Sequence, residues 1–378
     1  MWDDLNENLD SLRSQGRLRQ LQPRRIEGVH LIDQAGRRLI NFGSNDYLGL
    51  ASFLASKTID VDSVGARASG LVCGWTDRHQ LLAEKIAAFE RTEAAIVFPS
   101  GFAACSGTVS ALCRQGDLIL SDALNHASLI DGCRLSKADR IVYPHRDVKA
   151  VARLLAQHRT QYRRVWIVTD SVFSMDGHVA PLRELCGVAS DHDATLIVDE
   201  AHGTGILGDH VSGACESLGV KDQVPIRIGT LSKALGGQGG FVACPRVVAE
   251  FLVNHCRPLI YSTALSMPAV ESAIVALEHP DELRRRRELV CALSRQLRSQ
   301  LGLSGVTAIE SGIPIIPIPI GSDAEAVAAS QRLYESGMFV PAIRPPTVPE
   351  GQARLRVSLS ADHRAEMLGR LIEGLPSF

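Results

Sequence analysis

The sequence predicts an α/β fold in which helices sandwich a mostly parallel central sheet, with a smaller α+β domain at the C-terminal end. Two observations predict this class. From about residue 78, short runs rich in Val and Ile alternate with amphipathic helical patterns, as in strands joined by crossover helices. Polar and glycine residues follow several of these runs directly, as they do at the carboxyl ends of parallel strands.

Composition excludes several other classes. The 378 residues are 45% hydrophobic and 22% charged, which is ordinary for a globular protein and too apolar for a mainly disordered chain. The net charge of −2 gives no overall nucleic-acid footprint. The one basic cluster, Arg284–Arg287, lies beside Asp281, Glu282 and Glu288 in a helical pattern, which indicates a solvated helix face.

Cysteine usage and hydropathy predict a cytoplasmic protein. The nine cysteines contain no C-x-x-C pair and have irregular spacing, so neither a disulfide framework nor a zinc cluster is expected. Reduced thiols are typical of the cytoplasm. No apolar run approaches 18 residues and the N-terminus has no signal-peptide pattern, so neither a membrane span nor a secretory signal is expected.

The predicted elements follow in chain order. Residues 1–43 form an N-terminal part, with an amphipathic helix over 1–25 that docks on the body through spaced leucines, and then a small hairpin. Residues 44–266 form the large domain. Its predicted strands lie in 94–101, 117–122, 140–145, 163–172, 194–202, 226–234 and 239–244. Its predicted helices include 79–92, 147–159 and 182–192.

The small domain is predicted over residues 267–378. An irregular stretch at 254–266 precedes it, and a long helical pattern covers 267–301. A strand at 313–321, a helix at 323–337 and a strand at 354–360 complete an α+β arrangement.

Two short motifs are misleading. Gly203-Thr-Gly205-Ile-Leu-Gly208 has the spacing of a dinucleotide fingerprint, but it does not lie in the first βαβ unit and lacks the acidic strand end that should follow. Asp199-Glu200-Ala201-His202 spells an acidic box found in some helicases, but no phosphate-binding G-x-x-x-x-G-K-[ST] loop occurs in the chain. Neither motif supports nucleotide chemistry.

The residues at the predicted strand ends together match the needs of pyridoxal 5′-phosphate. This cofactor needs a lysine for a Schiff base and an acidic partner for its ring nitrogen. Asp199 ends the buried run ATLIVD, and His202 follows it closely enough to reach the ring's phenolic oxygen. Ser100-Gly101-Phe102 opens a helix after a strand, where free backbone N–H groups can bind a phosphate.

Lys233 is the best candidate for the amine. The chain has only six lysines, and Lys233 alone lies in a glycine-rich, otherwise uncharged segment after the strand that ends near Thr230. The glycines from Gly236 to Gly240 allow the backbone to approach a planar ligand and leave the lysine room to move. The amine must be neutral to act as a nucleophile.

These motifs, in this order, resemble the α-oxoamine synthase family of fold-type I pyridoxal-phosphate enzymes, over nearly the whole chain. The matching segments are Ser44–Leu50, the glycine-rich Gly65–Gly74, Pro99–Ala104, His126–Ser128, Ser174–Gly177, Asp199–Gly205, Lys233–Gly237, Tyr261–Thr263, Ala342–Pro349 and Arg354–Arg356. Two departures are Cys105, where the family often has Asn, and Arg67-Ala68, where many relatives have Gly.

The resemblance implies a role for each matching residue. Lys233 carries the cofactor and moves a proton, His126 stacks on its ring, Asp199 pairs with the ring nitrogen, and His202 and Ser174 lie near its phenolic oxygen. The phosphate contacts it implies are Gly101, Phe102 and Thr230, with Ser262 and Thr263 reaching from a second subunit. Its substrate contacts are Asn45, His126, Arg344, Thr347 and Arg19, with Arg17, Arg24 and Arg25 as alternatives to Arg19.

The implied activity is a decarboxylative condensation of an amino acid with an acyl thioester in a homodimer. The 342–356 segment favours alanine and a pimeloyl thioester, carried by coenzyme A or an acyl carrier protein. Three alternatives stay open: an enzyme that uses glycine and acetyl-CoA, a non-catalytic regulatory protein that binds the cofactor, and a subunit that needs a partner chain as in the sphingolipid branch. No metal, nucleic acid or membrane is expected to take part.

Overall fold

The structure, a computed structural model, describes residues 2–57 and 63–376. Its contacts divide the chain into two compact units. Unit 1 comprises Met1–Tyr47, Met175–Gly177 and Leu289–Phe378, and unit 2 comprises Leu48–Ser174 and His178–Glu288. The domains expected over residues 1–43, 44–266 and 267–378 stay predictions. Residues 1, 58–62 and 377–378 of these ranges lie outside the described residues.

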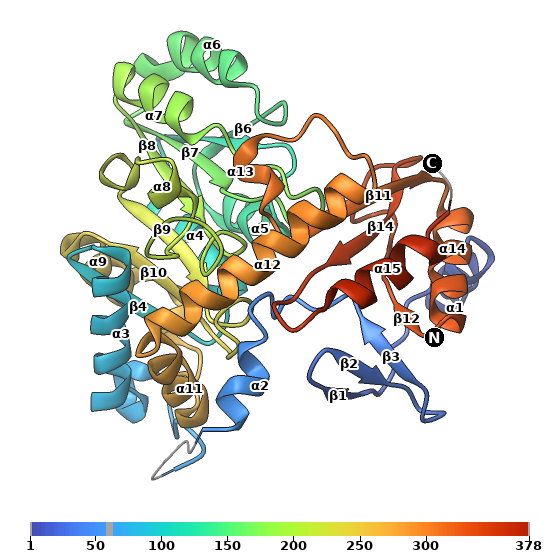
Figure 1. The fold of residues 1–378 in the computed structure, drawn as a ribbon. Coiled ribbons are helices and arrows are strands. Elements are labelled where there is room, and N and C mark those ends of the chain that lie inside the picture. The colour runs from blue at the N-terminus through green and yellow to red at the C-terminus, as the bar shows by residue number, and fades with distance from the viewer. Residues whose placement is uncertain (1, 58–62, 377–378) are drawn as a thin grey trace. The chain divides into compact units, whose positions relative to one another are not determined.

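Unit 2 is built on a seven-stranded sheet with the order β4-β10-β9-β8-β7-β5-β6 (Figure 1). Its strands are β4 (Ala94–Phe98), β5 (Asp117–Asp122), β6 (Asp139–Tyr143), β7 (Arg164–Asp170), β8 (Ala194–Asp199), β9 (Ile226–Thr230) and β10 (Gly240–Cys244). The five strands β6, β5, β7, β8 and β9 run parallel, whereas β10 is antiparallel to both β4 and β9. The mostly parallel sheet is therefore confirmed.

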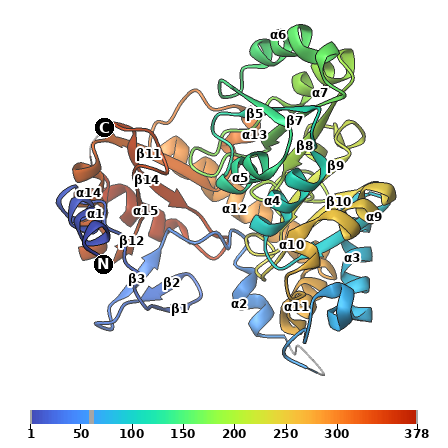
Figure 2. The ribbon, with the colours of Figure 1, turned by 180° about the vertical axis from the view of Figure 1, so that it is seen from behind.

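Helices cover both faces of this sheet, which explains why β5 and β9 are buried at every position. The helices of unit 2 are α2 (Leu50–Ala55), α3 (Asp77–Glu90), α4 (Gly101–Leu112), α5 (Ala127–Leu135), α6 (Val148–His158), α7 (Leu182–Asp191), α8 (Ala214–Ser217), α9 (Arg246–His255), α10 (Arg257–Ile260) and α11 (Met267–Leu277). Short π and 3-10 turns lie at Gly70–Gly74, Arg159–Gln161 and Lys221–Gln223. Helices α4 and α5 pack side by side, as Figure 2 shows from behind.

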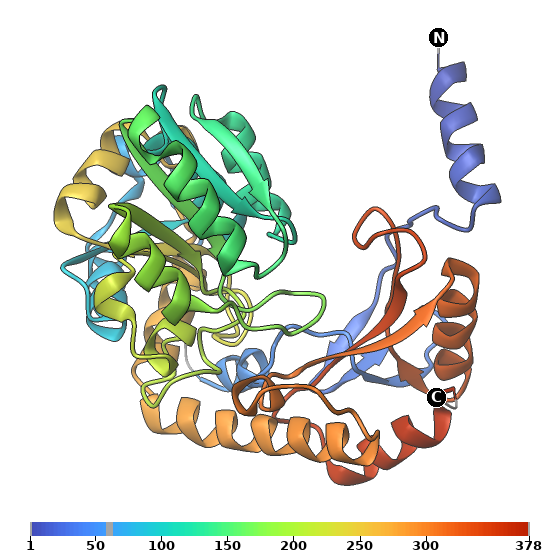
Figure 3. The ribbon, with the colours of Figure 1, turned by 90° about the horizontal axis from the view of Figure 1, so that it is seen from above.

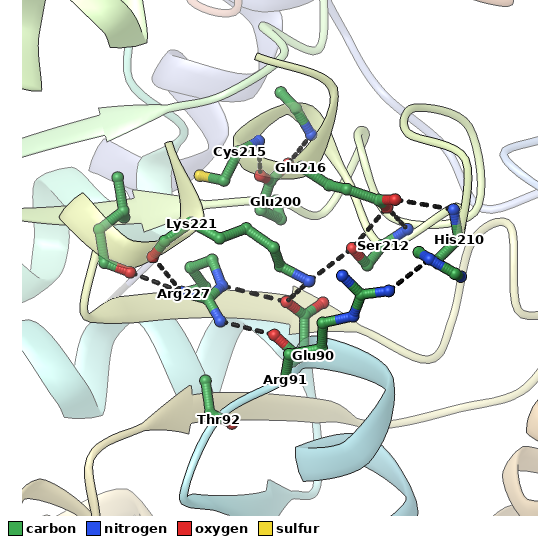
Figure 4. Close-up of polar contacts among 12 residues, drawn as sticks. Glu90, Arg91, Thr92, Glu200, His210, Ser212, Cys215, Glu216, Lys221 and Arg227 are labelled. Atoms are coloured by element: carbon green, nitrogen blue, oxygen red, sulfur yellow. Dashed lines mark hydrogen bonds and ion pairs between the residues drawn. The ribbon is translucent and has the colours of Figure 1, made fainter. Parts of the chain in front are cut away.

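Alternation along β9 shows how the two faces differ. Ile226 and Ile228 point into an apolar cluster with residues of α4, α5 and α9. Arg227 points to the opposite face, where its Nε donates to Glu90 Oε2 at 3.1 Å, near the end of α3 (Figure 4). One strand thus joins the apolar core to a buried ion pair.

Unit 1 contains two small sheets. The first has the order β1-β2-β3-β12, from β1 (Arg25–Glu27), β2 (His30–Ile32), β3 (Arg38–Asn41) and β12 (Met338–Phe339). The second has the order β11-β14-β13, from β11 (Ile315–Gly321), β14 (Ala353–Ser358) and β13 (Ala342–Ile343). The other helices are α1 (Asp3–Ser14), α12 (Pro280–Gln300, which begins in unit 2), α13 (Ala308–Ser311), α14 (Asp323–Glu335) and α15 (Ala365–Gly374).

The predicted hairpin after residue 26 is confirmed, because β2 and β3 pair antiparallel, and β3 also pairs with the distant β12. The N-terminal helix is present, but none of its residues is buried, so its expected docking on the body is wrong. Figure 3 shows α1 standing clear of the sheets of its unit. The leucine spacing alone does not predict docking, because most residues of this helix are polar and leave little apolar surface to bury.

The helical pattern over 267–301 forms two helices rather than one. Helix α11 ends at Leu277 and α12 begins at Pro280. Proline is favoured in the first turn of a helix but lacks an N–H group for the interior, so it starts a new helix here. The stretch at 254–266, expected to be irregular, contains the short α10. Among the described residues, no helix has the length and hydropathy needed to span a membrane.

Candidate active site

The carboxyl ends of the central strands bring the predicted cofactor residues together in unit 2. Strands β7, β8 and β9 are parallel neighbours, and Asp170 at the end of β7 pairs in register with Asp199 at the end of β8. Thr230 ends β9, and Lys233 follows three residues later. Because parallel strands end at one edge of the sheet, residues far apart in sequence converge there.

Lys233 and His202 are in direct contact. The Nζ atom of Lys233 lies 2.8 Å from Nε2 of the buried His202. An ammonium group can only donate hydrogen bonds, so with a protonated Lys233 the Nε2 of His202 acts as the acceptor. The histidine then carries its proton on Nδ1 and is neutral. The predicted amine is therefore held by a second predicted site residue.

Asp199 is buried, with 4% of its surface exposed, and both its oxygens are hydrogen-bonded. The backbone N–H of Ala201 donates to Oδ1 at 2.8 Å, and the Cys105 thiol donates to Oδ2 at 3.1 Å. Burial and the charge of Asp199 raise the pKa of Cys105 well above its ordinary value. The thiol thus keeps its proton, and Cys105 supports the carboxylate directly.

His126 is the N-cap of α5 and lies at the same edge. Its backbone N–H donates to Asp170 Oδ2 at 2.6 Å, and its Nδ1 lies 2.7 Å from Ser128 Oγ. The Phe102 ring meets the His126 ring edge-on, with 6.4 Å between centroids. Partial desolvation and the charge of Lys233 lower the pKa of His126, while Asp199 opposes the shift. The ring is thus neutral near pH 7 and sits close to both charged groups.

Asp170 is a site residue that the sequence interpretation missed. It is buried, it fixes the backbone of His126, and desolvation together with the charge of Asp199 raises its pKa well above the ordinary value. Its signal was present, since Asp170 ends the run VWIVTD just as Asp199 ends ATLIVD. Equivalent positions on neighbouring strands could have identified it.

The start of α4 forms a tight, small-residue corner suited to a phosphate. Ser100 caps the helix by accepting from the Ala103 N–H at 3.1 Å. A Cβ atom added to Gly101 would lie 3.2 Å from Thr230 Oγ1, and one added to Gly240 would lie 2.6 Å from the Gly101 backbone. The glycines thus let β9 and β10 approach the helix N-terminus, whose N–H groups favour anions.

The remaining predicted cofactor residues lie on loops of unit 2. Ser174 is half-buried in the turn closed by the Phe173 N–H donating to His178 O at 2.9 Å. Ser262 is half-buried and Thr263 is exposed. Thr263 forms a bridge with Ser69 in the glycine-rich segment, so these two segments make one surface.

Apart from His126, which lies in unit 2, the predicted substrate residues lie in unit 1. Asn45 Oδ1 accepts hydrogen bonds from Tyr47 Oη at 3.1 Å and from Arg356 at 3.2 Å. Separately, Arg19 donates to Thr347 Oγ1 at 3.4 Å. The Arg344 guanidinium donates to the Gly16 carbonyl, and the Arg344 carbonyl oxygen accepts from the Thr347 N–H at 3.0 Å. Its role as a carboxylate contact stays a prediction.

Arg356 was not predicted as a substrate residue, although it lies in a matching segment. It is 5% exposed, and its guanidinium also donates to Ser358 Oγ at 2.6 Å and Tyr47 Oη at 3.2 Å. A buried, oriented guanidinium is well suited to bind a carboxylate in bidentate fashion. The sequence signal was weak, because the chain is rich in arginine and Arg356 lies among strand residues.

The unit 2 residues fit pyridoxal 5′-phosphate. The buried Asp199 carboxylate offers a partner for a cationic ring nitrogen, and Lys233, in contact with His202, offers an amine at the same sheet edge. Gly101 and Gly240 let the strand ends pack closely against the N-terminus of α4, whose backbone N–H groups can bind a phosphate. The donor set therefore matches each end of this cofactor.

The class of protein follows from comparison with known families. Residues 37–375 match the model of the aminotransferase class I and II family. The chain belongs to this family, and the expected fold class is thereby confirmed.

Individual proteins with high sequence identity show which members of this family the chain resembles. The chain is 43% identical to an 8-amino-7-oxononanoate synthase of Anaeromyxobacter dehalogenans, covering 99% of this chain and 94% of that protein. It is 41% identical to the enzyme of the same name from Lysinibacillus sphaericus, covering 98% and 97%. The predicted resemblance to the α-oxoamine synthases is confirmed by these relatives.

The fold is also similar to those of solved structures of related enzymes. A Sphingomonas wittichii serine palmitoyltransferase superposes with a TM-score of 0.89 at 30% identity, covering 99% of this chain and 96% of that one. An 8-amino-7-oxononanoate synthase from Francisella tularensis gives a TM-score of 0.71 at 29% identity, covering 89% and 96%. Other similar serine palmitoyltransferase structures contain PLP.

Proposed function

We propose that this protein catalyses the reaction for which its relatives are named, with pyridoxal 5′-phosphate as cofactor. L-alanine condenses with a pimeloyl thioester to give 8-amino-7-oxononanoate, CO2 and the free thiol carrier, in biotin biosynthesis. The carrier is coenzyme A or an acyl carrier protein. The observation that carries the proposal is the 2.8 Å contact between Lys233 Nζ and His202 Nε2, at the sheet edge that also carries Asp199.

When bound, the cofactor supplies an aldehyde for an amine and a ring that stores the charge of a carbanion. The residues that would hold it are Gly101, Phe102, His126, Ser174, Asp199, His202, Thr230 and Lys233. Asp199 would pair with the ring nitrogen. Its buried site weakens competition from water and strengthens that charge pairing, while Ala201 and Cys105 hold the carboxylate in place.

Lys233 is the proposed proton carrier. In its neutral form, its Nζ would remove the α-proton of the amino acid, and the resulting ammonium group would later return a proton to the product carbon. His202 holds Nζ by the 2.8 Å contact, so the amine has a defined position at the start. His126, whose lowered pKa keeps it neutral, would cover the reacting carbon and limit the access of water.

For the substrates, we propose that the amino-acid carboxylate is bound by Asn45 together with an arginine. Arg344 is the candidate from the family resemblance, and Arg356 is favoured by its hydrogen bond to Asn45 Oδ1. Thr347 and Arg19 are proposed for the acyl chain, with Arg19 at its distal carboxylate, and their 3.4 Å contact supports a shared role. Arg17, Arg24 and Arg25 remain alternatives to Arg19.

We also propose a homodimer in which Ser262 and Thr263 complete the phosphate site of the partner. Leu71, Val72 and Tyr261 are exposed apolar residues on the surface where the glycine-rich segment meets the 261–264 segment. Exposed apolar side chains clustered in this way are typical of an interface. A cytoplasmic location is proposed on the nine free thiols.

Shared sites can be tested by complementation. A Lys233→Ala protein is mixed with a Ser262→Ala/Thr263→Ala protein. The subunits are then dissociated and allowed to reassociate, so that hybrid dimers form. Hybrid dimers would contain one site with neither change, so activity should return to a substantial fraction of the wild-type value. Mixtures that stay as inactive as the separate variants, despite mass-verified hybrids, would contradict the shared site.

The reaction itself is tested in two steps. The protein is incubated with pyridoxal 5′-phosphate, reduced with borohydride and mapped by mass spectrometry, with the label expected on the peptide containing Lys233. Turnover is then compared for alanine with pimeloyl thioester and for glycine with acetyl-CoA. Absence of the label would favour a different protein class, whereas turnover only with glycine and acetyl-CoA would favour the sister activity.

A further inference from the structure

Glu200 lies between two proposed site residues and has not been given a function so far. It follows Asp199, precedes His202 by two positions, and is only 1% exposed. Its Oε2 accepts hydrogen bonds from Ser171 Oγ at 2.7 Å and from the Ala214 N–H at 2.9 Å. Its Oε1 accepts from the Cys215 N–H at 2.7 Å (Figure 4). One carboxylate therefore joins two other segments, residue 171 and residues 214–215, to the turn that follows β8.

The backbone of Glu200 fixes the turn that carries His202. Its N–H donates to Ile228 O on β9 at 2.6 Å. Its carbonyl oxygen accepts from the N–H groups of Gly203 and Thr204, each at 2.8 Å. The main chain on both sides of His202 is thus tied to the residue whose side chain is anchored by Ser171, Ala214 and Cys215.

Two glycines leave the space that the Glu200 carboxylate occupies. A Cβ atom at Gly203 would lie 2.2 Å from Glu200 Oε2, and one at Gly213 would lie 2.5 Å from the same carboxylate. Such distances are too short for any real contact, so these positions accept no side chain while Glu200 stays in place. Gly203 is the first glycine of the segment with the spacing of a dinucleotide fingerprint, and this packing explains why a glycine stands there.

We propose that Glu200 is a positioning residue that holds His202 in contact with Lys233. The inference rests on the proposed function of Lys233 and His202, and it extends that function to a residue that touches neither the amine nor the cofactor. Glu200 acts by fixing the 200–204 turn against β9 and against the 213–215 segment.

The charge of the side chain is essential to this role. The three groups that donate to the Glu200 carboxylate are the Ser171 hydroxyl and the backbone N–H groups of Ala214 and Cys215. A carboxylate accepts all three, whereas a carboxamide has one acceptor oxygen and an NH2 group that would face at least one donor. Glu200→Gln keeps the size of the side chain and removes only the ability to accept all three hydrogen bonds.

Glu216 provides a matched control within the same loop. It also binds backbone and hydroxyl donors, accepting from the His210 N–H at 2.7 Å, the Ser212 N–H at 3.0 Å and Ser212 Oγ at 2.8 Å (Figure 4). In the part of the chain that the structure describes, its carboxylate makes no hydrogen bond to the turn at 200–204. Glu216→Gln therefore disturbs a similar network at a greater distance along the chain from His202.

The test measures Lys233 itself in the protein without cofactor. The rate constant for modification of Lys233 by trinitrobenzenesulfonate is determined by peptide mapping between pH 6 and 10. Donation to His202 favours the protonated amine, so its loss should make Lys233 more reactive. We expect His202→Ala and Glu200→Gln to raise the rate constant near neutral pH by about fivefold each and to shift the pH midpoint downward. Glu216→Gln should stay within about twofold of the wild type.

A double variant separates positioning from general destabilisation. If Glu200 acts through His202, Glu200→Gln has no further effect on Lys233 reactivity in a protein that already carries His202→Ala. Independent, multiplying effects would overturn the proposal, as would an unchanged rate constant in folded Glu200→Gln. If that variant does not fold, Ser171→Ala removes one donor and should shift the rate constant in the same direction by a smaller factor, and no shift would overturn the proposal.

The outcome is distinguishable from failure of the proposed function. Borohydride trapping of pyridoxal 5′-phosphate on wild-type Lys233 tests that function and does not involve Glu200. Successful trapping with unchanged reactivity in Glu200→Gln would reject only the positioning role. Failed trapping in the wild type would reject the function, whatever the labelling rates show.

Discussion

The two regions that hold the proposed site residues differ in how their polar groups are paired. At the sheet edge of unit 2, Asp170, Asp199 and Glu200 are buried and hydrogen-bonded. In unit 1, Arg19 and Thr347 are exposed and share one 3.4 Å contact. Buried polar groups that lose a hydrogen-bond partner are costly, whereas exposed polar contacts contribute little to stability. Chemistry should therefore depend on the first region and selectivity on the second.

Replacing the amine should have the largest effect. Lys233→Ala removes the only proposed proton carrier, and turnover should fall by at least about 10³-fold while the fold is retained. The measurement is product formation together with circular dichroism. Lys137→Ala, which changes an exposed lysine, should retain normal turnover. Substantial turnover of Lys233→Ala would remove this residue from the mechanism.

Removing the charge of Asp199 should have the next largest effect. Asp199→Asn keeps the size of the side chain but loses the anion that would pair with a cationic ring nitrogen. Turnover should fall by about 10²-fold, and the dissociation constant of pyridoxal 5′-phosphate should rise by at least about tenfold. Equilibrium titration of the cofactor checks the second value. Unchanged affinity and turnover would contradict the assignment of Asp199.

A buried histidine makes unit 1 sensitive to acid independently of activity. Desolvation lowers the pKa of His363 from 6.5 to about 4, and its ring stacks on Phe42 with centroids 4.5 Å apart. The unfolded chain therefore binds a proton at higher pH than the folded chain does. The stability associated with neutral His363 is complete above about pH 6.5 and is lost as the pH falls toward 4, by about 2 kcal/mol at pH 5.

Thermal unfolding between pH 7.5 and 5.0 tests this dependence. The wild type should lose more stability than His363→Leu, because leucine removes the titrating group and keeps an apolar side chain of moderate size. Equal losses in both proteins would show that other groups cause the acid sensitivity.

Unit 1 offers two arginines, Arg356 and Arg344, for the carboxylate of the amino acid. Arg356→Gln removes a buried guanidinium that binds Asn45 and Tyr47, and the KM for alanine should rise by about tenfold or more. Arg344→Gln should change this KM by less than about threefold. Steady-state kinetics with varied alanine at saturating acyl thioester measures both. The reverse order would support Arg344 as the carboxylate partner.

The smallest effect is expected at the exposed acyl-chain candidates. Arg19→Gln should raise the KM for pimeloyl thioester about threefold to tenfold and leave the KM for a monocarboxylic acyl thioester of similar length unchanged. Parallel kinetics with both thioesters measure this selectivity. The same change produced instead by Arg17→Gln, Arg24→Gln or Arg25→Gln would assign the distal carboxylate to that arginine.

Much of this organisation could be predicted from local patterns. The strands from β5 to β10 begin and end close to the runs of Val and Ile, because burial on both faces requires continuous apolar residues. Lys233 and Asp199 could be selected because their residue types and strand-end positions match the chemistry of one cofactor. The continuous helix over 267–301 and the docking of α1 were wrong, since spacing alone does not show where a helix restarts or whether its face meets a partner.

Local sequence patterns were sufficient to predict the fold class, the order of the strands along the chain and the identity of the lysine and aspartate at their ends. The groups that support them were identified from the folded chain, such as the Cys105 thiol on Asp199, 94 positions away, and the Asn45 contact of Arg356. The reason is physical. Periodicity and residue type act over a few neighbouring positions, whereas these hydrogen bonds form only after the folded sheets bring distant segments within about 3 Å.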